Sequence, residues 1–382
     1  MTRAKTNLLF VTPCFEEGGG ERFMVNLFAN LDTDRFAMIL LSWRVRKSHF
    51  IDLIPPHVRH IDLGLRERFR YELPGLIWKM RSVLRRERPD IIVCMLNEWH
   101  IVTLLAMRLS GLRPALILEE QGGISCWLDV LRKEQSLRAG IVEFLYKHVY
   151  LRCADMVICC SNDVARDFDR NFGADRSKLR PILNPLDTAS IESMAKEDVD
   201  HPWFNKGLPI VIGVGRLTPH KGNRFLVQAF ARVNAELPAR LIIVADGPER
   251  PEIEKLIEDL GIKDVADILG YRSNPFKYLA RSTVFVCPSL SEGCPYVVEE
   301  ALAVGTPVVA TRCTGSTEIL QDGKCGLLVP QEDVDALAQA ILRVLKDKDL
   351  QQNLSRLGRQ RAQDFSVKAI TREYERAFSE YV

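Results

Sequence analysis

Two short segments in the second half of the chain carry side chains that suit the binding of phosphates and sugars. In the first, residues 213–222 (GVGRLTPHKG), Arg216 and Lys221 lie on a loop just before a predicted helix. Two cations beside a helix N-terminus favour binding of a phosphate or diphosphate. The segment lacks the GxxxxGK[ST] pattern of a P-loop, so two solvated loop cations are the alternative.

The second segment is residues 291–300 (SEGCPYVVEE). Pro295 suits the first turn of a helix, which places Glu300 about one turn inside that helix and Glu292 on the loop before it. The loop glutamate can contact a ligand at a strand end, and the helix glutamate can accept hydrogen bonds from a vicinal diol. A solvated helix face is the alternative for such a pair, and we expect Glu299 to face solvent.

Other loops after predicted strands are rich in glycine. Residues 18–20 (GGG) permit close approach of backbone N–H groups to an anion. They do not fit GxGxxG, so NAD binding, a tight turn and a phosphate-facing loop stay open. Gly247 and the pair Gly270–Tyr271 follow strands and turn sharply, which suits backbone contact with a nucleobase or phosphate. Ordinary βα turns are the alternative.

Histidines and metal ligands are weaker candidates. His100 follows a predicted strand and can act as a general base, and His220 adjoins Lys221, although a core or surface position is the alternative for both. The Asp-x-Asp triplets, which can hold a divalent metal, lie in helical or linker stretches away from strand ends. The ten cysteines include no CxxC pair. We therefore expect reduced, buried thiols and no metal site.

Short apolar runs alternate with amphipathic stretches along the whole chain, which predicts βαβ units and parallel sheets. Runs that are apolar throughout indicate strands buried on both faces. The predicted strands of the first half are 8–12, 37–43, 58–63, 91–96, 116–119, 156–161 and 179–184. The predicted helices among them are 22–31, 73–88 and 140–152.

The second half repeats this plan after a polar stretch that we expect to be a linker. Its predicted strands are 210–215, 239–245, 268–270, 284–288, 307–311 and 326–329. Its predicted helices are 222–236, 251–260, 275–280, 296–304 and 334–346, with a last helix over 367–381. The pattern predicts an α/β protein with two Rossmann-like, doubly wound domains facing a cleft. Ligands of such sheets bind at the carboxyl ends of strands, which is where the motifs lie.

Composition excludes several classes of protein. The chain has 382 residues, of which 47% are apolar and 27% charged, as in two soluble globular domains. A net charge of +2 argues against nucleic-acid binding. No secretory signal is recognised, and the most apolar stretch, 101–118, is too polar for a membrane span.

The two halves differ in charge. Residues 1–190 carry 28 basic and 23 acidic side chains, whereas residues 191–382 carry 24 and 27. Much of the excess lies in the basic stretch 66–88. An acidic partner, an anionic membrane surface and chance composition are the three interpretations.

The second half resembles retaining glycosyltransferases of the family-4 type, which have the GT-B fold. The resemblance covers nearly all of residues 210–330 and includes two glutamates separated by seven residues. The matching segments are 214–217, 221–222, 246–249, 269–271 and 291–311. The first half matches more loosely, at 18–20, 154–161 and 184–187.

The resemblance implies roles for these motifs. Arg216, Lys221 and Glu292 become the predicted catalytic residues, since the two cations would hold the donor diphosphate and Glu292 would hold the sugar. Glu300 would bind the ribose hydroxyls, and Tyr271 would lie near the base. The predicted donor-binding residues are Gly18, Gly19, Gly215, Gly247, Tyr271, Gly293, Cys294, Pro295, Tyr296 and Glu300. Family members retain the anomeric configuration without a protein nucleophile and need no metal or other cofactor.

The chain departs from the family pattern on the acceptor side. Gln121 replaces a histidine that often follows the fifth strand, and a glutamine cannot serve as a base. Glu120 and His100 are the candidates to substitute for it, so these three are the predicted acceptor-side residues. Asn184-Pro185 replaces the usual Asn-Gly, a variant that favours a lipid-linked or glycan acceptor.

We therefore predict a cytoplasmic, metal-independent hexosyltransferase of polysaccharide or glycoconjugate synthesis. The expected donor is a UDP-sugar, with GDP second, and the acceptor is a glycan or lipid-linked saccharide. A peripheral contact with the inner face of the cytoplasmic membrane is a further expectation. The alternatives are a non-catalytic nucleotide or glycan-binding protein, another GT-B enzyme such as a sugar-nucleotide epimerase or a phosphorylase, and an NAD-dependent dehydrogenase.

The predicted domains follow from the same analysis. We expect an acceptor-binding domain over 1–186, a linker over 187–206 and a nucleotide-sugar-binding domain over 207–365. The last segment, 366–382, is expected to pack back on the first domain as a helix.

Overall fold

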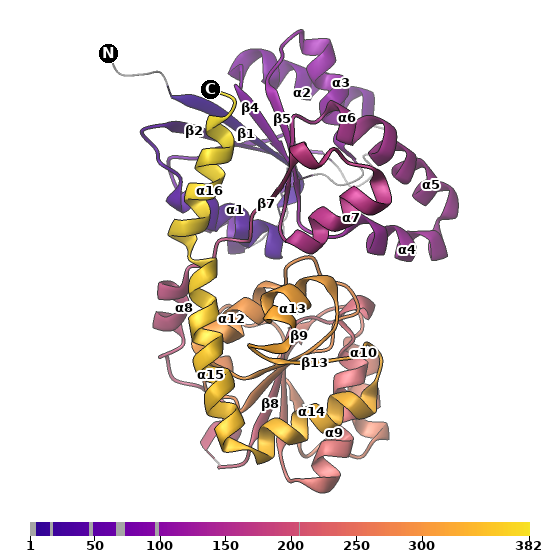
Figure 1. The fold of residues 1–382 in the computed structure, drawn as a ribbon, viewed down its shortest axis with the longest axis vertical. Coiled ribbons are helices and arrows are strands. Elements are labelled where there is room, and N and C mark those ends of the chain that lie inside the picture. Colours follow the sequence, from indigo (N-terminus) through magenta and orange to yellow (C-terminus); the bar gives the residue numbers. More distant parts are fainter. Residues whose placement is uncertain (1–4, 16–17, 46–48, 66–72, 96–98, 206) are drawn as a thin grey trace. The chain divides into compact units, whose positions relative to one another are not determined.

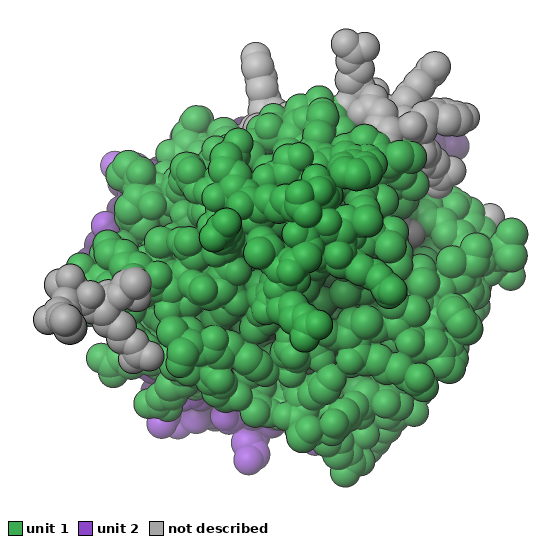
Figure 2. All heavy atoms as spheres, turned by 90° about the horizontal axis from the view of Figure 1, so that it is seen from above, with its two compact units in different colours: residues 1–185, 367–382 green, residues 186–366 purple. Residues whose placement is uncertain are grey.

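The computed structural model describes residues 5–15, 18–45, 49–65, 73–95, 99–205 and 207–382. The chain forms two compact units, which have different colours in Figure 2. Unit 1 is Met1–Pro185 with Val367–Val382, and unit 2 is Leu186–Ser366. Each unit contains one parallel sheet with helices packed on it (Figure 1). The predicted fold class is therefore confirmed at the level of the two sheets.

The sheet of unit 1 has seven strands in the order β3-β2-β1-β4-β5-β6-β7. Residues 8–11 of β1 are fully buried, because helices cover both faces of the sheet. The strand order reverses between β1 and β4, and doubly wound sheets bind ligands at the carboxyl ends near such a switch. The strands are β1 (Thr6–Phe15), β2 (Phe36–Val45), β3 (Arg59–Asp62), β4 (Ile91–Cys94), β5 (Ala115–Glu120), β6 (Met156–Cys159) and β7 (Leu179–Pro181).

The helices of unit 1 follow the amphipathic stretches of the sequence. The one predicted over 140–152 begins earlier, at Ser136, and is continued by a π-helical turn and a short α-helix. The helices are α1 (Gly19–Asn30), α2 (Leu73–Glu87), α3 (His100–Ser110), α4 (Ile124–Glu134), α5 (Ser136–Leu145), η4 (Tyr146–Tyr150), α6 (Leu151–Cys153), α7 (Asn162–Phe172) and α16 (Val367–Ser379), with 3-10 turns η1 (His49–Leu53) and η5 (Arg176–Lys178).

Helix α16, the last helix of the chain, packs on unit 1 (Figure 1). The ring of Phe378 lies 6.2 Å from that of Phe10 in β1 and 6.1 Å from that of Phe36 in β2. The ring of Tyr374 lies 5.5 Å from that of Phe23 in α1. Tyr374 and Phe378 are fully buried, so α16 is part of the core of unit 1.

The sheet of unit 2 has six strands in the order β10-β9-β8-β11-β12-β13. Alternate residues of β9, namely Leu241, Ile243 and Ala245, belong to one apolar core. Phe230 of α9 (Asn223–Glu236) and Ile341 of α14 (Val334–Lys346) belong to the same core. The strands are β8 (Ile210–Arg216), β9 (Arg240–Asp246), β10 (Ala266–Ile268), β11 (Val284–Cys287), β12 (Val308–Thr311) and β13 (Leu327–Val329).

The helices of unit 2 alternate with these strands. They are α8 (Thr188–Met194), α9 (Asn223–Glu236), α10 (Arg250–Asp259), α11 (Phe276–Ala280), α12 (Tyr296–Val304), α13 (Thr314–Ile319), α14 (Val334–Lys346) and α15 (Lys348–Ala362), with 3-10 turns η6 (Pro202–Asn205), η7 (Pro219–Lys221), η8 (Gln321–Gly323) and η9 (Gln363–Phe365). Among the helices that the structure describes, none is long and apolar enough to cross a membrane.

The stretch expected to be a linker, 187–206, contains helix α8 and turn η6 and is assigned to unit 2. The Asp187 side chain caps α8 by accepting a hydrogen bond from the backbone N–H of Ser190 at 3.0 Å. Asn274 donates from Nδ2 to the Met194 carbonyl at 2.9 Å, and the Tyr278 hydroxyl donates to Asp200. These bonds attach the polar stretch to the neighbourhood of α11.

Candidate functional site

The two motifs singled out in unit 2 meet in an ion pair. Lys221, at the end of η7, places its Nζ 2.5 Å from Oε1 of Glu292 on the loop between β11 and α12. The same carboxylate oxygen accepts a hydrogen bond from the Ser289 hydroxyl at 2.8 Å. The Leu290 N–H donates to the His220 carbonyl at 2.8 Å, which joins the two loops through their backbones. Residues 71 positions apart therefore form one site.

The ion pair controls the charge of Lys221. Its side chain is only 24% exposed, and that of Glu292 is 12% exposed. Burial acts to lower the pKa of Lys221, but the charge of Glu292 and its hydrogen bond outweigh burial and hold that pKa above its usual value. Lys221 therefore stays a cation in a partly desolvated position, where its attraction for an anion is stronger than in water.

Gly222 fixes the position of this loop. It has a φ of +65°, and a Cβ there would lie 2.2 Å from the Pro288 carbonyl oxygen, just after the end of β11. Only glycine tolerates both the left-handed conformation and this contact. The close approach of the two backbones keeps Lys221 beside the loop that carries Glu292.

Arg216 lies at the same edge of the sheet. It is the last residue of β8, in register with Asp246 at the end of β9, and its side chain is exposed. Gly247, with a φ of +154°, follows Asp246, and a Cβ there would lie 2.4 Å from the Leu217 carbonyl oxygen. Gly215 has a φ of +147°. The predicted residues Gly215, Arg216 and Gly247 thus share the carboxyl edge of neighbouring strands.

The loop before α12 packs against the start of α13. The Gly315 N–H donates to the Glu292 carbonyl at 3.1 Å, and a Cβ on Gly315 would lie 2.4 Å from the Gly293 carbonyl oxygen. Cys294, Pro295 and Tyr296 are buried beside this contact. Sequence analysis missed Gly315 and Ser289, although Gly315 follows the strand β12 just as the predicted motifs follow theirs.

The expectation that Glu299 faces solvent is wrong. Glu299 is fully buried, and its Oε1 accepts a hydrogen bond from the Cys294 thiol at 3.1 Å. Burial raises its pKa to about 8, against the lowering effect of Cys294 and of the charge of Arg361. Helix α12 is covered on its outer side by α15, where Gly358 approaches Leu302, so α12 has no solvated face. Glu300 is 1% exposed on the same helix.

Tyr271 lies apart from the ion pair. It is half-exposed on the loop after β10, the edge strand, and β9 separates that strand from β8. Gly270 before it has a φ of +73°, which accounts for the predicted sharp turn. A place near a nucleobase remains a prediction for Tyr271.

In unit 1 the two alternative acceptor-side residues form one buried pair. His100 at the start of α3 places Nε2 3.2 Å from Oε1 of Glu120 at the end of β5, and each side chain is 1% exposed. The Tyr146 hydroxyl donates to the same carboxylate oxygen at 3.1 Å. Gln121, which follows, is partly exposed and donates from Nε2 to Oε1 of Glu119 at 2.7 Å. The acceptor role of these residues remains a prediction.

The glycine loop of unit 1 lies at the carboxyl end of β1. Gly18 is the N-cap of α1, which begins at Gly19, and a Cβ on Gly18 would lie 2.9 Å from the Glu21 carboxylate. Residues 16–17 of this loop lie outside the described residues. Donor binding by Gly18 and Gly19 remains a prediction.

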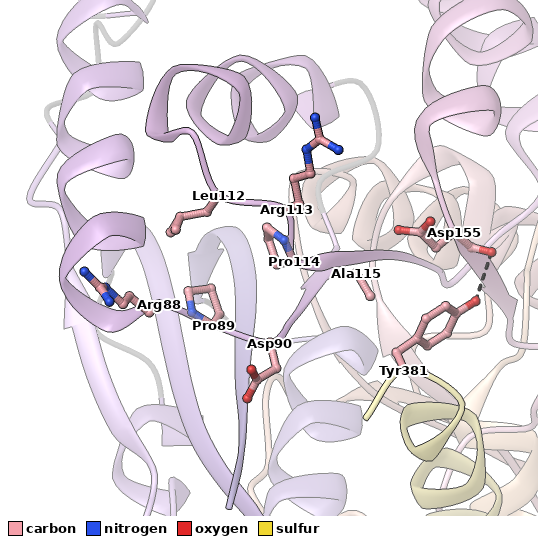
Figure 3. A pocket seen from close by; sticks show the side chains of 9 residues that line it. All are labelled: Arg88, Pro89, Asp90, Leu112, Arg113, Pro114, Ala115, Asp155 and Tyr381. Atoms are coloured by element: carbon pink, nitrogen blue, oxygen red, sulfur yellow. Dashed lines mark hydrogen bonds between the residues drawn. The ribbon is translucent and has the colours of Figure 1, made fainter.

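A polar pocket of about 650 Å³ lies at the other end of the unit 1 sheet (Figure 3). Asp90 precedes β4, Ala115 begins β5 and Asp155 precedes β6, so the pocket is at the amino ends of the strands. The Tyr381 hydroxyl donates to the Asp155 carbonyl at 3.1 Å there. Since ligands of doubly wound sheets bind at the carboxyl ends, this pocket is not part of the candidate site.

The acidic triplets are engaged in local contacts where the structure describes them. Asp167 accepts a hydrogen bond from the Ser125 N–H at 3.0 Å, and Asp169 forms an ion pair with Arg176 at 2.6 Å. Within the described ranges, no group of three or more His, Cys, Asp or Glu side chains is placed to hold a metal ion.

Comparisons with known proteins agree with this architecture. A model described as glycosyl transferases group 1 matches residues 195–361, and a model described as glycosyltransferase family 4 matches residues 17–190. The N-acetyl-alpha-D-glucosaminyl L-malate synthase of Bacillus anthracis is 32% identical over 80% of this chain and 78% of its own length.

Two further relatives cover almost the whole chain. An N-acetylgalactosamine-N,N'-diacetylbacillosaminyl-diphospho-undecaprenol 4-alpha-N-acetylgalactosaminyltransferase of Campylobacter jejuni is 27% identical over 93% of this chain and 94% of its own. The structure of Anabaena HepE in complex with UDP-glucose matches with a TM-score of 0.79, at 20% identity, over 98% of this chain and 99% of that one.

The paired parallel sheets and these structural matches show the GT-B fold. The family models and the Bacillus anthracis relative show that the chain is a glycosyltransferase of this fold class. Within that class, the chain belongs to the group 1 glycosyltransferases, of the family 4 type.

The buried carboxyl of Glu299 predicts a specific pH dependence of stability. Folding raises its pKa from 4.5 to about 8, so between these values the folded state keeps a proton that the unfolded state has released. The contribution of Glu299 is complete below pH 4.5 and is lost as the pH rises through 8. The glutamine of Glu299→Gln cannot ionise. The free energy of unfolding of this variant should therefore rise relative to that of the wild type as the pH rises from 5 to about 8.5.

Urea unfolding of both proteins across this range measures the difference. Gln352→Ala, on the exposed surface of α15, replaces a side chain that cannot ionise and is the control, for which the difference should stay flat with pH. A flat difference for Glu299→Gln as well would show that Glu299 is ionised in the folded protein.

Proposed function

We propose that the protein transfers a sugar from a nucleoside diphosphate sugar to a glycan or lipid-linked saccharide, with retention of the anomeric configuration. The observation that carries the proposal is the Lys221–Glu292 ion pair at the strand ends that also present Arg216. UDP is the proposed nucleotide, with GDP second. The protein would need no metal.

The ion pair suits a site that exchanges one anion for another. Before the donor binds, Glu292 is the counter-ion of the partly buried Lys221. A diphosphate carries more negative charge than one carboxylate, so it competes for Lys221 and for the exposed Arg216. Glu292, still held by the Ser289 hydroxyl, then has acceptor capacity for the hydroxyls of the transferred sugar.

The same cations would act on the reaction. As the bond between the anomeric carbon and the diphosphate breaks, negative charge grows on the leaving oxygen, and Lys221 and Arg216 stabilise it. These two fixed cations supply the positive charge at the diphosphate, which supports metal-independent transfer. On the retaining route, the acceptor hydroxyl attacks the anomeric carbon on the same face from which the diphosphate leaves. The departing phosphate takes the proton of that hydroxyl.

The relatives support the donor and acceptor classes. Anabaena HepE binds UDP-glucose in its crystal structure. The name of the Campylobacter jejuni relative places a diphospho-undecaprenol saccharide in the reaction of that enzyme. A nucleotide-sugar donor and a lipid-linked or glycan acceptor are therefore the proposed substrates here.

Replacing the cations should separate activity from folding. Lys221→Ala and Arg216→Ala should each lower kcat/KM for the donor by about 100- to 1000-fold, since one charged group that stabilises a leaving oxygen contributes about 3–4 kcal/mol. The free energy of unfolding of Arg216→Ala should change far less, because its side chain is exposed at the end of β8. Lys221→Ala leaves the partly buried Glu292 without its counter-ion and should be less stable, so its activity is measured on protein that circular dichroism shows to be folded. Release of nucleoside diphosphate from UDP-sugars and GDP-mannose, with octyl glycosides as acceptors and EDTA present, measures turnover. NMR of the product gives its anomeric configuration.

The control variant is Lys255→Ala, which removes an exposed lysine of α10 and should keep full activity. Unfolding of Arg216→Ala at ordinary temperature, or full donor turnover by folded Lys221→Ala, would contradict the assignment. So would activity that EDTA abolishes, or an inverted product.

We further propose that unit 1 contacts an anionic membrane surface through α5. Leu137, Ile141 and Phe144 follow one another at helical spacing and are 81%, 52% and 58% exposed. His148 continues this face, with its ring 4.7 Å from that of Phe144. Lys147 lies beside it and forms an ion pair with Glu143 of α5 at 2.7 Å. Exposed apolar side chains beside basic ones suit a helix that lies in the lipid interface.

The described part of the basic stretch, 73–88, contributes less to such a surface. Residues 66–72 lie outside the described residues. On α2, Lys79, Arg81 and Arg85 donate hydrogen bonds to backbone carbonyls of unit 1 and so are held against it. The exposed Trp78 stacks with Arg81 at 4.8 Å.

Vesicle sedimentation tests the α5 surface. Binding to phosphatidylcholine vesicles that contain phosphatidylglycerol should fall at least about tenfold in the double variant Ile141→Ser/Phe144→Ser, because two partly inserted apolar side chains are lost. Leu260→Ser, at an exposed leucine of unit 2, should bind like the wild type. Equal binding by all three proteins would exclude α5 as the contact.

A further inference from the structure

The end of β5 directs two adjacent carboxyl groups to opposite faces of the unit 1 sheet. Glu120 faces α3 and η4, where it contacts His100 and Tyr146. Glu119 faces α16, where the Tyr374 hydroxyl donates to its Oε2 at 3.2 Å. Alternation of side chains along a strand requires this division. The candidate acceptor-side residues therefore have a second buried carboxyl group behind them, which sequence analysis did not single out.

Glu119 holds the side chain of Gln121. Its Oε1 accepts the Gln121 Nε2–H at 2.7 Å, while its Oε2 contacts Tyr374, so both carboxyl oxygens have a protein partner. Glu119 is 1% exposed, and burial raises its pKa to about 8 in spite of the hydrogen bonds from Gln121 and Tyr374. A buried group with both oxygens engaged has little freedom to move.

The bond to Glu119 determines what Gln121 can offer a ligand. Because Nε2 is turned toward Glu119, the amide presents its carbonyl oxygen and one remaining N–H on its other side. Gln121 is partly exposed at the carboxyl end of β5, ahead of α4. A carbonyl oxygen fixed there is an acceptor for a hydroxyl group.

Tyr374 connects this arrangement to the glycine loop. Its ring packs on Phe23 in the second turn of α1, the helix whose first residues follow Gly18. Tyr374 is fully buried, so one side chain of α16 contacts both helix α1 and the end of strand β5. The packing of α16 on unit 1 therefore helps to hold Glu119 beside Gln121.

We infer that Glu119 and Tyr374 are positioning residues that orient the Gln121 amide to accept a hydrogen bond from a hydroxyl of the saccharide acceptor. The inference rests on the proposed function, because that function supplies the hydroxylic substrate. Gln121 contacts the substrate in this account, and Glu119 acts only through Gln121. The chain thus uses a fixed amide where related chains often have a histidine.

Kinetics with octyl glycosides as acceptors tests the inference. Gln121→Ala and Glu119→Leu should each raise the acceptor KM about tenfold, the effect of one hydrogen bond worth about 1.4 kcal/mol. The donor KM and the affinity for UDP should stay within about twofold of the wild-type values. Tyr374→Phe should raise the acceptor KM about threefold, since Glu119 keeps its bond to Gln121.

A double variant separates positioning from a general structural effect. If Glu119 acts through Gln121, Glu119→Leu/Gln121→Ala should be no worse than Gln121→Ala alone. Glu119→Gln keeps an oxygen that can accept the Gln121 N–H, so its acceptor KM should lie within about threefold of the wild-type value. This variant tests the inference if Glu119→Leu folds poorly. Urea unfolding of every variant accompanies the kinetics.

The outcomes distinguish this inference from the proposed function. Additive losses in the double variant, or an unchanged acceptor KM in Glu119→Leu, overturn the positioning role while the enzyme remains active. Equal loss of donor and acceptor affinity in Glu119→Leu also overturns it, because the effect would then be structural. Absence of donor turnover in the wild type overturns the proposed function, and the inference with it.

Discussion

Lys221, whose side chain is about three-quarters buried, needs a counter-ion. The loops at the carboxyl edge of the unit 2 sheet are arranged so that one of them supplies it. Glu292 supplies the charge for Lys221, and Ser289 holds the carboxylate in place. A buried charge left without a partner would cost several kcal/mol, so the pair joins two loops that are far apart in sequence. The same requirement makes the site receptive to another anion.

Close backbone contacts make that edge rigid. Gly222, Gly247 and Gly315 each lie where a Cβ would come within 2.4 Å of a carbonyl oxygen. Three loops are therefore locked to their neighbours at the strand ends, and side chains such as Arg216 extend from a fixed frame. Groups fixed in advance stabilise developing charge without reorganising during the reaction. Unit 1 obtains similar rigidity from side chains, through the contacts of Glu119 with Gln121 and Tyr374.

Most strands were predictable because they are short apolar runs, buried on both faces, that leave a strong local signal, as in β4 and β11. The strands β3 and β7 contain polar, partly exposed residues and have a weaker signal. All thirteen are present, in two parallel sheets. The site loops were predictable as sequence motifs, and the resemblance to the family that they support is confirmed. Glu299 was not predictable, because its burial depends on α15, which packs on α12 where Gly358 approaches Leu302, more than fifty positions earlier in the chain. The contact of Tyr374 with Glu119 joins positions 255 apart, and no local pattern encodes it.

In the proposed function, Lys221 and its neighbours bind the diphosphate of a nucleotide. Calorimetric titration of the metal-free protein with UDP, GDP, ADP, CMP and NAD, beside the Lys221→Ala variant, tests it most directly. We expect selective binding of one nucleoside diphosphate, most favourably UDP, and loss of that binding in Lys221→Ala. Binding that does not depend on Lys221, or no binding of any diphosphate, would contradict it.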